Sequence, residues 1–338
     1  MITIKSPTRV DLAGGTLDLW PLYNFLDTAR TVNLAIDIWT KVNLEGRTDG
    51  SIEIHSLDLK QKWNFENYKQ FIETLDPKLH LYQSVISKFH KKAPAAVEKG
   101  FAVNTQSESP IGGGLGGSSS LIISMMKAFS QLTNIKFASS HEMAHWAHNL
   151  EAEILNTPTG TQDYYPAITG GLNHLDYGTF GITQTVADPK GSPLHDNFLL
   201  VYTGRSHHSG LNNFEVLKSA VTQDTKVMNA LKKIKLIADD LWQAIQDNAW
   251  DKLPELFREE YDARIQLTPA FTSPEIERLN QIGLSNGALA VKICGAGGGG
   301  CVLVWVTPEH RQKVITACEN EKFQCLNARP VSPLQDPL

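Results

Sequence analysis

The chain has few cysteines and no sign of a secreted or membrane protein. Its four cysteines, Cys294, Cys301, Cys318 and Cys325, lie near the C-terminus without a Cys-x-x-Cys pair. This fits neither a zinc ribbon nor a disulfide framework, so we expect reduced structural thiols. The start, MITIKSPTRV, lacks a basic region followed by an apolar stretch, so we expect no signal peptide and a cytoplasmic protein. The uncharged run 109–126 is about half Gly and Ser, which is too polar to span a membrane.

The chain also has only a small excess of one sign of charge. The 338 residues carry a net charge of −5, with 20% charged and 41% hydrophobic residues, which is an ordinary globular composition and argues against a general nucleic-acid binder. At roughly 150 residues per domain, the length predicts about two domains with room for a cleft between them. No repeat or charge block marks a linker, so the boundary is placed only within 176–200.

Apolar spacing predicts a β-rich first half and an α+β second half. Alternating residues in 39–58, split by Thr48-Asp49-Gly50, predict a hairpin. Helical spacing begins directly after residue 117, and a second helix is expected over 139–155, capped by Ser139 or Ser140 and ending before Pro158. The stretch 157–171 has turn chemistry. Further helices are expected over 213–248, 274–286 and 308–319, with buried strands over 288–293 and 301–306.

Glycine is average in number but not in distribution. Ten of the 25 glycines fall into two windows, residues 112–117 and 295–300. The first window leads straight into a predicted helix, so the backbone can approach a phosphate closely while the helix N-terminus offers free N–H groups. A Walker loop would end in Gly-Lys-Ser/Thr, and a Rossmann fingerprint would follow a hydrophobic strand. Neither fits Ser109-Pro110, so we predict a phosphate site of another kind, with a flexible Gly/Ser turn as the alternative.

Three ordered blocks resemble the GHMP kinase family, which includes galactokinase, homoserine kinase, mevalonate kinase and phosphomevalonate kinase. Residues 110–119 are similar to its central motif, residues 7–19 to its first motif, and residues 292–301 to its third. The resemblance covers nearly the whole chain. It implies a two-domain α+β fold, with a ribosomal-protein-S5-domain-2-like N-terminal domain over 1–185 that binds ATP and sugar, and a ferredoxin-like C-terminal domain over 186–338.

The resemblance also implies roles for individual residues. Arg9 would sit by the reacting phosphate, and Asp18, nine residues later, would hydrogen-bond sugar hydroxyls, with Gly15, Thr16 and Gly171 near the acceptor. Gly15 and Thr16 replace a Glu-His pair of galactokinases, which argues against galactose. The ATP site would comprise Pro110, Gly112, Gly113, Gly114, Leu115, Gly116, Gly117, Ser118, Ser119 and Ser120. The second glycine loop, Gly295, Gly297, Gly298 and Gly299, would close the site.

The segment 146–163 carries the remaining implied residues. Glu151 stands seven residues before Pro158, as in mevalonate kinases, and would hold Mg²⁺ together with Ser118. Asp163 matches the Gly-x-x-Asp spacing of galactokinases and heptose kinases, and would accept or orient the proton of the acceptor hydroxyl. A loop aspartate in a turn is the alternative.

A rival motif lies in the preceding helix. His141-Glu-Met-Ala-His145 is a literal His-Glu-x-x-His, the signature of zinc metallopeptidases. A metzincin would need Gly at 148 and His or Asp at 151, whereas this chain has His148 and Glu151. Three kinase motifs outweigh it, and we expect these histidines to serve helix packing and surface hydrogen bonding.

Details of the blocks are most similar to the D-glycero-D-manno-heptose phosphate kinase branch. These are Asp18-Leu19, Gln162-Asp163, Gly170-Gly-Leu-Asn173 and Tyr202-Thr203-Gly204. The resemblance implies an ATP- and Mg²⁺-dependent sugar kinase acting on an anomeric hydroxyl, with the heptose 7-phosphate as the best candidate. Fucose, a uronic acid, a mevalonate-type alcohol, or a non-catalytic sugar and ATP sensor remain alternatives, and a homodimer is left open. Arg205, His207 and His208, in a loop expected at a strand end, are candidates for binding the sugar or its phosphate, with a solvated loop as the alternative.

Overall fold

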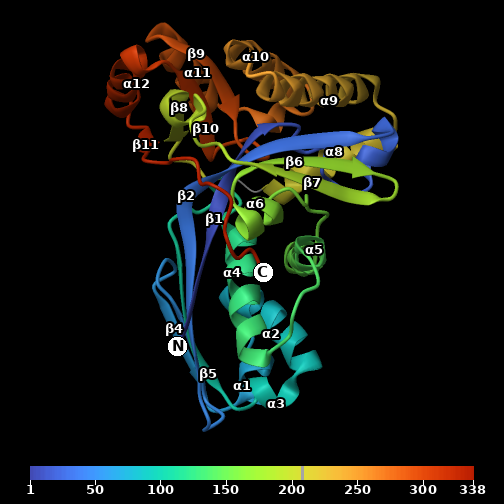
Figure 1. Ribbon diagram of the computed structural model, residues 1–338, viewed down its shortest axis with the longest axis vertical. Coiled ribbons are helices and arrows are strands. Elements are labelled where there is room, and N and C mark those ends of the chain that lie inside the picture. The colour runs from blue at the N-terminus through green and yellow to red at the C-terminus, as the bar shows by residue number, and fades with distance from the viewer. Residues whose placement is uncertain (207–208) are drawn as a thin grey trace.

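Two β-sheets organise the chain, one above the other (Figure 1). The computed structural model describes residues 1–206 and 209–338, with the backbone alone for residues 209–211. His207 and His208, two of the candidate sugar-binding residues, lie outside the described residues. In the described part of the chain, every helix is too short or too polar to cross a bilayer.

The first sheet has seven strands, ordered β4-β3-β5-β2-β6-β7, with β1 paired to β2. Strand β2 is the longest, and its length lets it pair with β1, β5 and β6. The strands are β1 (Ile2–Ala13), β2 (Ala29–Gly46), β3 (Ile52–Ser56), β4 (Gln61–Phe65), β5 (Phe101–Ser107), β6 (Leu172–Gly178) and β7 (Gly181–Ala187).

The predicted hairpin over 39–58 is wrong in its pairing, although both strands exist. β5 inserts between β2 and β3, antiparallel to the former and parallel to the latter. The turn at Gly50 instead hydrogen-bonds the chain that enters β5, with Gly50 N donating to Lys99 O and Phe101 N to Ser51 O. The local turn signal had suggested that β2 and β3 pair directly with each other. Instead, β5 comes from far along the chain and pairs with both of them.

Helices cover one face of the first sheet, with α4 (Gly117–Thr133) packed against β1 and β2. The predicted helices after residue 117 and over 139–155 are confirmed as α4 and α5 (Ser140–Leu155), and Ser139 caps α5 by accepting from Glu142 N. The predicted turn region 157–171 also contains a short helix, α6 (Tyr164–Thr169). The β-rich first half was incomplete as a prediction, because η1 (Leu22–Leu26), α1 (Tyr68–Glu73), η2 (Pro77–Leu79), α2 (His80–Lys92) and α3 (Pro94–Val97) also occur there.

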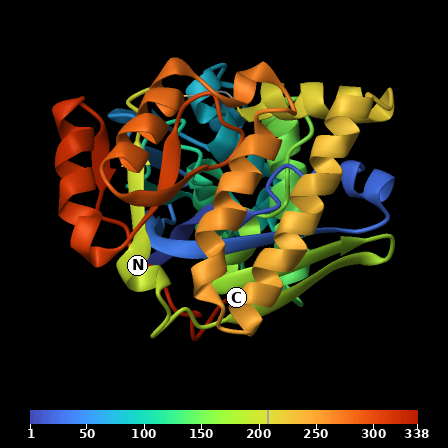
Figure 2. The same cartoon turned by 90° about the horizontal axis from the view of Figure 1, so that it is seen from above.

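The second sheet has four strands, ordered β11-β8-β10-β9. Its strands are β8 (Phe198–Tyr202), β9 (Ala288–Ile293), β10 (Cys301–Val306) and β11 (Gln324–Leu326), and the predicted bounds of β9 and β10 are confirmed. Helices α9 and α10 lie side by side (Figure 2). The helices of this part are α7 (Leu194–Asn197), α8 (Ser209–Val221), α9 (Thr225–Gln246), η3 (Trp250–Lys252), α10 (Leu253–Arg264), η4 (Pro269–Phe271), α11 (Pro274–Ser285) and α12 (Pro308–Asn320).

A hydrophobic cluster joins the two sheets. It combines Val10 and Leu34 of the first sheet with Leu241, Phe257 and Trp305 around the second, all at most 2% exposed. The first sheet ends at residue 187 and the second begins at 198, so the predicted division after residue 185 falls inside β7 and stays a prediction. The mixed two-layer architecture itself agrees with the expected α+β fold.

Candidate active site

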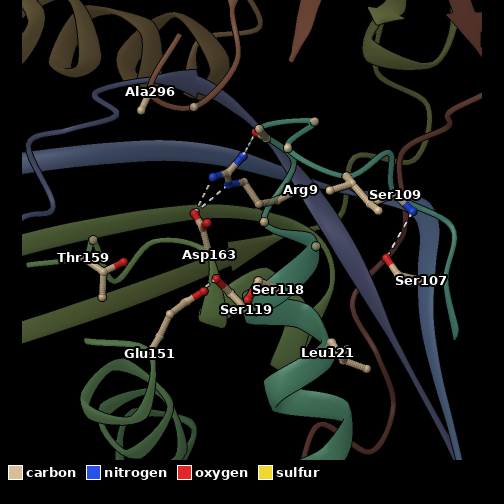
Figure 3. A pocket seen from close by; sticks show the side chains of 18 of the residues that line it. Arg9, Ser107, Ser109, Ser118, Ser119, Leu121, Glu151, Thr159, Asp163 and Ala296 are labelled. Atoms are coloured by element: carbon tan, nitrogen blue, oxygen red, sulfur yellow. Dashed lines mark hydrogen bonds and ion pairs between the residues drawn. The ribbon is translucent and has the colours of Figure 1, made fainter. Parts of the chain in front are cut away.

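A cavity of about 350 Å³ collects residues from both ends of the chain and from its middle. Its walls come from the first motif, the first glycine window, the start of α4, the end of α5, the loop before α6, and the second glycine window (Figure 3). Among the predicted site residues, those that line it are Arg9, Thr16, Asp18, Pro110, Gly112, Gly113, Gly114, Gly116, Gly117, Ser118, Ser119, Glu151, Asp163 and Gly295.

The first glycine window ends as the N-cap of α4. Gly116 occupies the cap with φ 70°, a left-handed conformation that favours glycine, and no side chain caps the helix. The N–H groups of the first turn are therefore available to an anion, which the helix dipole also attracts. A Cβ at Gly116 would lie 3.1 Å from Asp163 Oδ2, so this carboxylate stands directly beside the first glycine window.

The two glycine windows meet in space. Cys301 N, just after the second window, donates to Gly113 O at 2.8 Å. A Cβ added to Gly295 would lie 3.0 Å from Gly114 O, and Gly295 has φ 64°. The second window thus packs directly on the first, and a side chain at Gly295 would push against the carbonyl of Gly114.

Arg9 and Asp163 form a close ion pair in the cavity (Figure 3). Arg9 donates from Nε to Asp163 Oδ1 at 2.7 Å, and its Nη2 lies 2.6 Å from the same oxygen. Burial disfavours the guanidinium charge, but Asp163 and then Asp11 keep the pKa of Arg9 above its ordinary value. Arg9 also donates to Gly114 O, so one cation links the aspartate to the first glycine window.

Glu151 reaches the cavity from α5 and meets the first turn of α4. Its Oε2 accepts from Ser119 Oγ at 2.7 Å and from Tyr164 OH at 2.6 Å. Burial raises the pKa of Glu151, while side-chain hydrogen bonds from Tyr164, Ser119 and Ser118 oppose the rise. Ser118 is exposed in the cavity, whereas Ser119 is buried. The two neighbours that the motif alone left together thus differ in exposure: Ser119 is buried against Glu151, whereas Ser118 also interacts with Glu151 but is accessible from the cavity.

Asp18 of the first motif also lines the cavity. Its Oδ2 accepts from Gln162 N at 3.0 Å. Burial raises the pKa of Asp18 to about 6, against the effect of that hydrogen bond. A Cβ at Gly160 would lie 1.9 Å from Asp18 Oδ2, so the glycine three residues before Asp163 leaves room for the carboxylate.

Several predicted residues do not line the cavity. Ser120 is buried and donates to Ser6 O, and Leu115 is buried in the core shared by the two sheets. Gly171 N donates to Val331 O, away from the cavity. Arg205 is half exposed and pairs with Glu275 at 3.3 Å. Gly15, Gly297, Gly298 and Gly299 are also outside the lining, and their backbones pack on Asp11, Phe271, Ala270 and Arg205 respectively.

The histidines of the rival motif have other partners. His141 Nδ1 lies 2.9 Å from Tyr165 OH, and Asn149 Nδ2 lies 3.2 Å from His145 Nε2. His148 Nε2 lies 3.0 Å from Thr159 O, in the loop that leads to Asp163. Among the residues that the structure describes, no group of three or more His, Cys, Asp or Glu side chains could hold a metal ion. These contacts agree with a packing role for the three histidines.

One set of residues beside the site escaped the sequence reasoning. Asp11, Glu260, Arg264 and Lys292 form an ion cluster with no side-chain exposure. Asp11 and Lys292 lie within recognised motifs, so their positions were visible but their partners were not. Helix α10, which carries the other two, was not predicted. Its apolar spacing at Leu253, Phe257 and Tyr261 could have revealed it.

Comparisons with known proteins agree with this geometry. Residues 80–171 match the GHMP kinases N terminal domain, and residues 241–325 match GHMP kinases C terminal. The chain is 28% identical over 330 residues to the D-glycero-alpha-D-manno-heptose 7-phosphate kinase of Campylobacter jejuni, covering 95% of this chain and 94% of that one. It is 27% identical over 305 residues to the mevalonate kinase of Thermococcus sibiricus, covering 84% of each.

The fold has a solved counterpart in a D-glycero-D-manno-heptose 1-phosphate kinase from Bacteroides thetaiotaomicron. The TM-score is 0.78 at 21% identity, over 98% of this chain and 97% of that one. The resemblance inferred from the three motifs is confirmed by the matched family regions, which include the first glycine window and the second. The chain belongs to the GHMP kinase family and is a phosphotransferase that acts on an alcohol group.

Proposed function

We propose that this protein transfers the γ-phosphoryl group of ATP to the anomeric hydroxyl of a sugar or sugar phosphate, with D-glycero-D-manno-heptose 7-phosphate as the best candidate. The observation that carries the proposal is the convergence of an uncapped helix N-terminus, the Arg9–Asp163 pair and the buried carboxylate of Asp18 on one cavity. The full-length similarity to a heptose 7-phosphate kinase supports this choice of acceptor.

The proposed reaction forms one P–O bond, breaks another, and releases the proton of the acceptor hydroxyl. The acceptor hydroxyl oxygen attacks the γ-phosphorus, the bond to the bridging oxygen breaks, and ADP leaves with that electron pair. Asp163 orients the hydroxyl and takes its proton or directs it to solvent; its Oδ2 faces Gly116, while Oδ1 is held by Arg9. The N–H groups at the start of α4 and the charge of Arg9 stabilise the negative charge that develops on the phosphoryl group.

The donors beside the phosphate loop fit Mg²⁺. This ion prefers oxygen ligands and is commonly held by one or two protein groups together with substrate phosphates. The accessible hydroxyl of Ser118 and the carboxylate of Glu151 both line the cavity at the start of α4. We propose that these two residues hold Mg²⁺, which would supply charge neutralisation of the phosphates. Ser119 and Tyr164 fix Glu151 in the orientation that this role needs.

A coupled ADP-release assay across several acceptors tests the proposal. The panel contains the heptose 7-phosphate, fucose, a uronic acid and mevalonate, each with ATP and Mg²⁺. We expect the highest kcat/KM with the heptose 7-phosphate. Preferred turnover of another acceptor would correct the substrate, and binding of sugar and ATP without turnover of any would replace the kinase by a sensor.

The variant Asp163→Asn tests the assigned role. We expect kcat to fall by about a thousandfold while the Kd for ATP stays within about twofold, because the lost group acts on the acceptor hydroxyl. Asp240→Asn, an exposed carboxylate on α9, is the matched control and should keep wild-type kcat. Retained turnover in Asp163→Asn would remove Asp163 from the mechanism.

A further inference from the structure

The buried ion cluster connects the second half of the chain to the first motif. Arg264 and Glu260 come from α10, Lys292 from β9, and Asp11 from β1. Asp11 Oδ2 lies 3.2 Å from both Arg264 Nη2 and Lys292 Nζ, and Lys292 Nζ lies 3.5 Å from Glu260 Oε1. Burying four charges has a large desolvation cost that pairing only partly offsets, so such a cluster is weak evidence for stability. Its position beside the cavity suggests a different use.

Arg264 extends its hydrogen bonds beyond the cluster, to acceptors in two loops. Its Nη2 donates to Gly15 O at 3.1 Å, and its Nη1 donates to Thr16 Oγ1 at 3.4 Å and to Gly295 O at 3.2 Å. A guanidinium has five donors in a fixed plane, which suits it to bridge several acceptors at once. One side chain therefore ties the turn of the first motif to the second glycine window.

The turn that Arg264 contacts is strained. Leu17 N donates to Gly14 O at 3.1 Å, which closes a four-residue turn, and Thr16 is its third residue with φ 78°. This φ is typical of the third position of a type II turn, where glycine or asparagine is preferred. A β-branched residue rarely adopts a positive φ, so neighbouring contacts must hold Thr16 there.

The strained turn lies at the acceptor side of the cavity. Thr16 is only 5% exposed and lines the cavity, and Asp18 follows two residues later. If the turn relaxed at Thr16, the backbone between residues 16 and 18 would rotate and Asp18 would leave its hydrogen bond with Gln162 N. The conformation of Thr16 thus bears on where the carboxylate of Asp18 lies in the cavity.

We infer that Arg264 is a positioning residue for the acceptor: it holds the strained Thr16 turn from the opposite half of the chain and so places Asp18 in the cavity. This inference rests on the proposed function, because it assigns the turn to the acceptor rather than to ATP. It also explains why an arginine is buried at this point of α10, where an apolar side chain would pack without desolvation cost.

The variant Arg264→Lys tests the inference because it keeps the charge but loses the planar set of donors. We expect the KM for the heptose 7-phosphate to rise by about tenfold or more, and the Kd for ATP, measured by calorimetry without acceptor, to stay within about twofold. Arg258→Lys is the matched control on the same helix, where Arg258 contacts Leu289 O, and should change neither value. Equal losses toward both substrates would overturn the inference.

A second-site variant separates positioning from general stability. With Thr16→Gly, position 16 can keep its positive φ without the contacts from Arg264. We therefore expect the double variant Thr16→Gly/Arg264→Lys to recover at least half of the acceptor affinity lost in Arg264→Lys. No recovery in the double variant would overturn the inference. If Arg264→Lys fails to fold, Thr16→Val removes the accepting hydroxyl while leaving the ion cluster intact, and an unchanged acceptor KM in that variant would also overturn it.

These results remain distinct from the proposed function. Wild-type protein that turns over no acceptor would refute the proposed kinase activity. In that case calorimetry compares the Kd of the heptose 7-phosphate for wild-type and Arg264→Lys protein. Equal Kd values would refute the positioning role of Arg264. Turnover by the wild type together with equal kinetics in Arg264→Lys would refute the inference alone.

Discussion

At the residue scale, the carboxylates of the cavity differ in burial and in their hydrogen-bond partners. Asp18 is 3% exposed and Glu151 6%, whereas the Asp163 side chain is 21% exposed and paired with Arg9. Burial raises the pKa of both Asp18 and Glu151, but side-chain hydrogen bonds from Tyr164, Ser119 and Ser118 oppose the change at Glu151. At Asp18 only backbone donors oppose it, and the pKa rises to about 6. Its protonation therefore changes within the range in which enzymes are assayed.

The raised pKa predicts a pH dependence of acceptor binding. In the proposed function ionised Asp18 would accept hydrogen bonds from sugar hydroxyls, and protonation would remove part of this capacity. With a pKa of about 6, we expect the acceptor KM to rise by about tenfold between pH 7 and pH 5, while the KM for ATP changes little. The measurement is a pH series of both KM values. Asp18→Asn should show a high acceptor KM that is independent of pH, and a flat wild-type profile would contradict the assignment.

The same shift predicts a gain of stability when the charge is removed. The folded pKa lies above the ordinary 3.8, so the protonated form stabilises the fold, and stability falls as the pH rises from about 4 through 6. Asp18→Asn should therefore unfold a few degrees higher than wild type at pH 7.5, with little difference at pH 4. Thermal unfolding at both values checks the sign. A variant that is less stable at pH 7.5 would show that the ionised group is stabilised in the fold.

At the element scale, the contact between the two glycine windows predicts that Gly295→Ala impairs the use of ATP, whereas Gly191→Ala does not. Gly295 and Gly191 both have positive φ, 64° and 78°, but a Cβ at Gly295 would lie 3.0 Å from Gly114 O, whereas a Cβ at Gly191 would have no atom of the described residues within 4 Å. We expect both alanine variants to lose about 1 kcal/mol of stability from the backbone conformation, and Gly295→Ala alone to raise the KM for ATP by about tenfold. Steady-state kinetics and thermal unfolding of both variants test this. Equal ATP kinetics would show that the windows do not cooperate.

Elements with strong local signals could be predicted from the sequence. α5 has a capping serine and a stop before Pro158, and β9 and β10 are short apolar runs next to glycines. α4 follows a glycine window, and its first turn carries the predicted serines. Ordered motifs also placed Arg9, Asp163 and Glu151 in one site before their distances were known.

Neither the pairing of distant strands nor the burial of charged side chains could be predicted in this way. β5 lies far from β2 and β3 in the sequence, so a local turn signal cannot indicate that it inserts between them. The buried face of α10 carries Glu260 and Arg264, which read as solvent-facing until their partners on β1 and β9 are known. The exclusion of Gly171 and Arg205 from the cavity likewise follows from contacts with Val331 and Glu275.

At the scale of the whole molecule, the chain crosses between its two halves more than once. The core around Leu34 and Trp305 is shared by both sheets, and Arg264 crosses from α10 to the first motif. After β11 the chain returns to the first sheet and ends near α6 (Figure 1). There Asp37 N donates to Arg329 O, Val331 N to Ala35 O, Gly171 N to Val331 O and Leu334 N to Thr169 O, at 2.8–3.0 Å. The returning segment thus fixes the C-terminal end of α6, whose N-cap is Asp163.

This arrangement predicts that the last ten residues hold α6, and with it Asp163, in place. Removal of residues 329–338 deletes four backbone hydrogen bonds, each worth about 1 kcal/mol, and should lower the unfolding temperature by about 5 °C. We also expect a several-fold loss of kcat, because α6 carries Asp163 at its start and loses its anchor at Thr169. Removal of residues 335–338 alone is the control and keeps all four bonds, so it should shift the unfolding temperature by less than about 1 °C. If the longer truncation lowers stability but leaves kcat intact, α6 is held by its packing on α4 and α5 rather than by the returning segment.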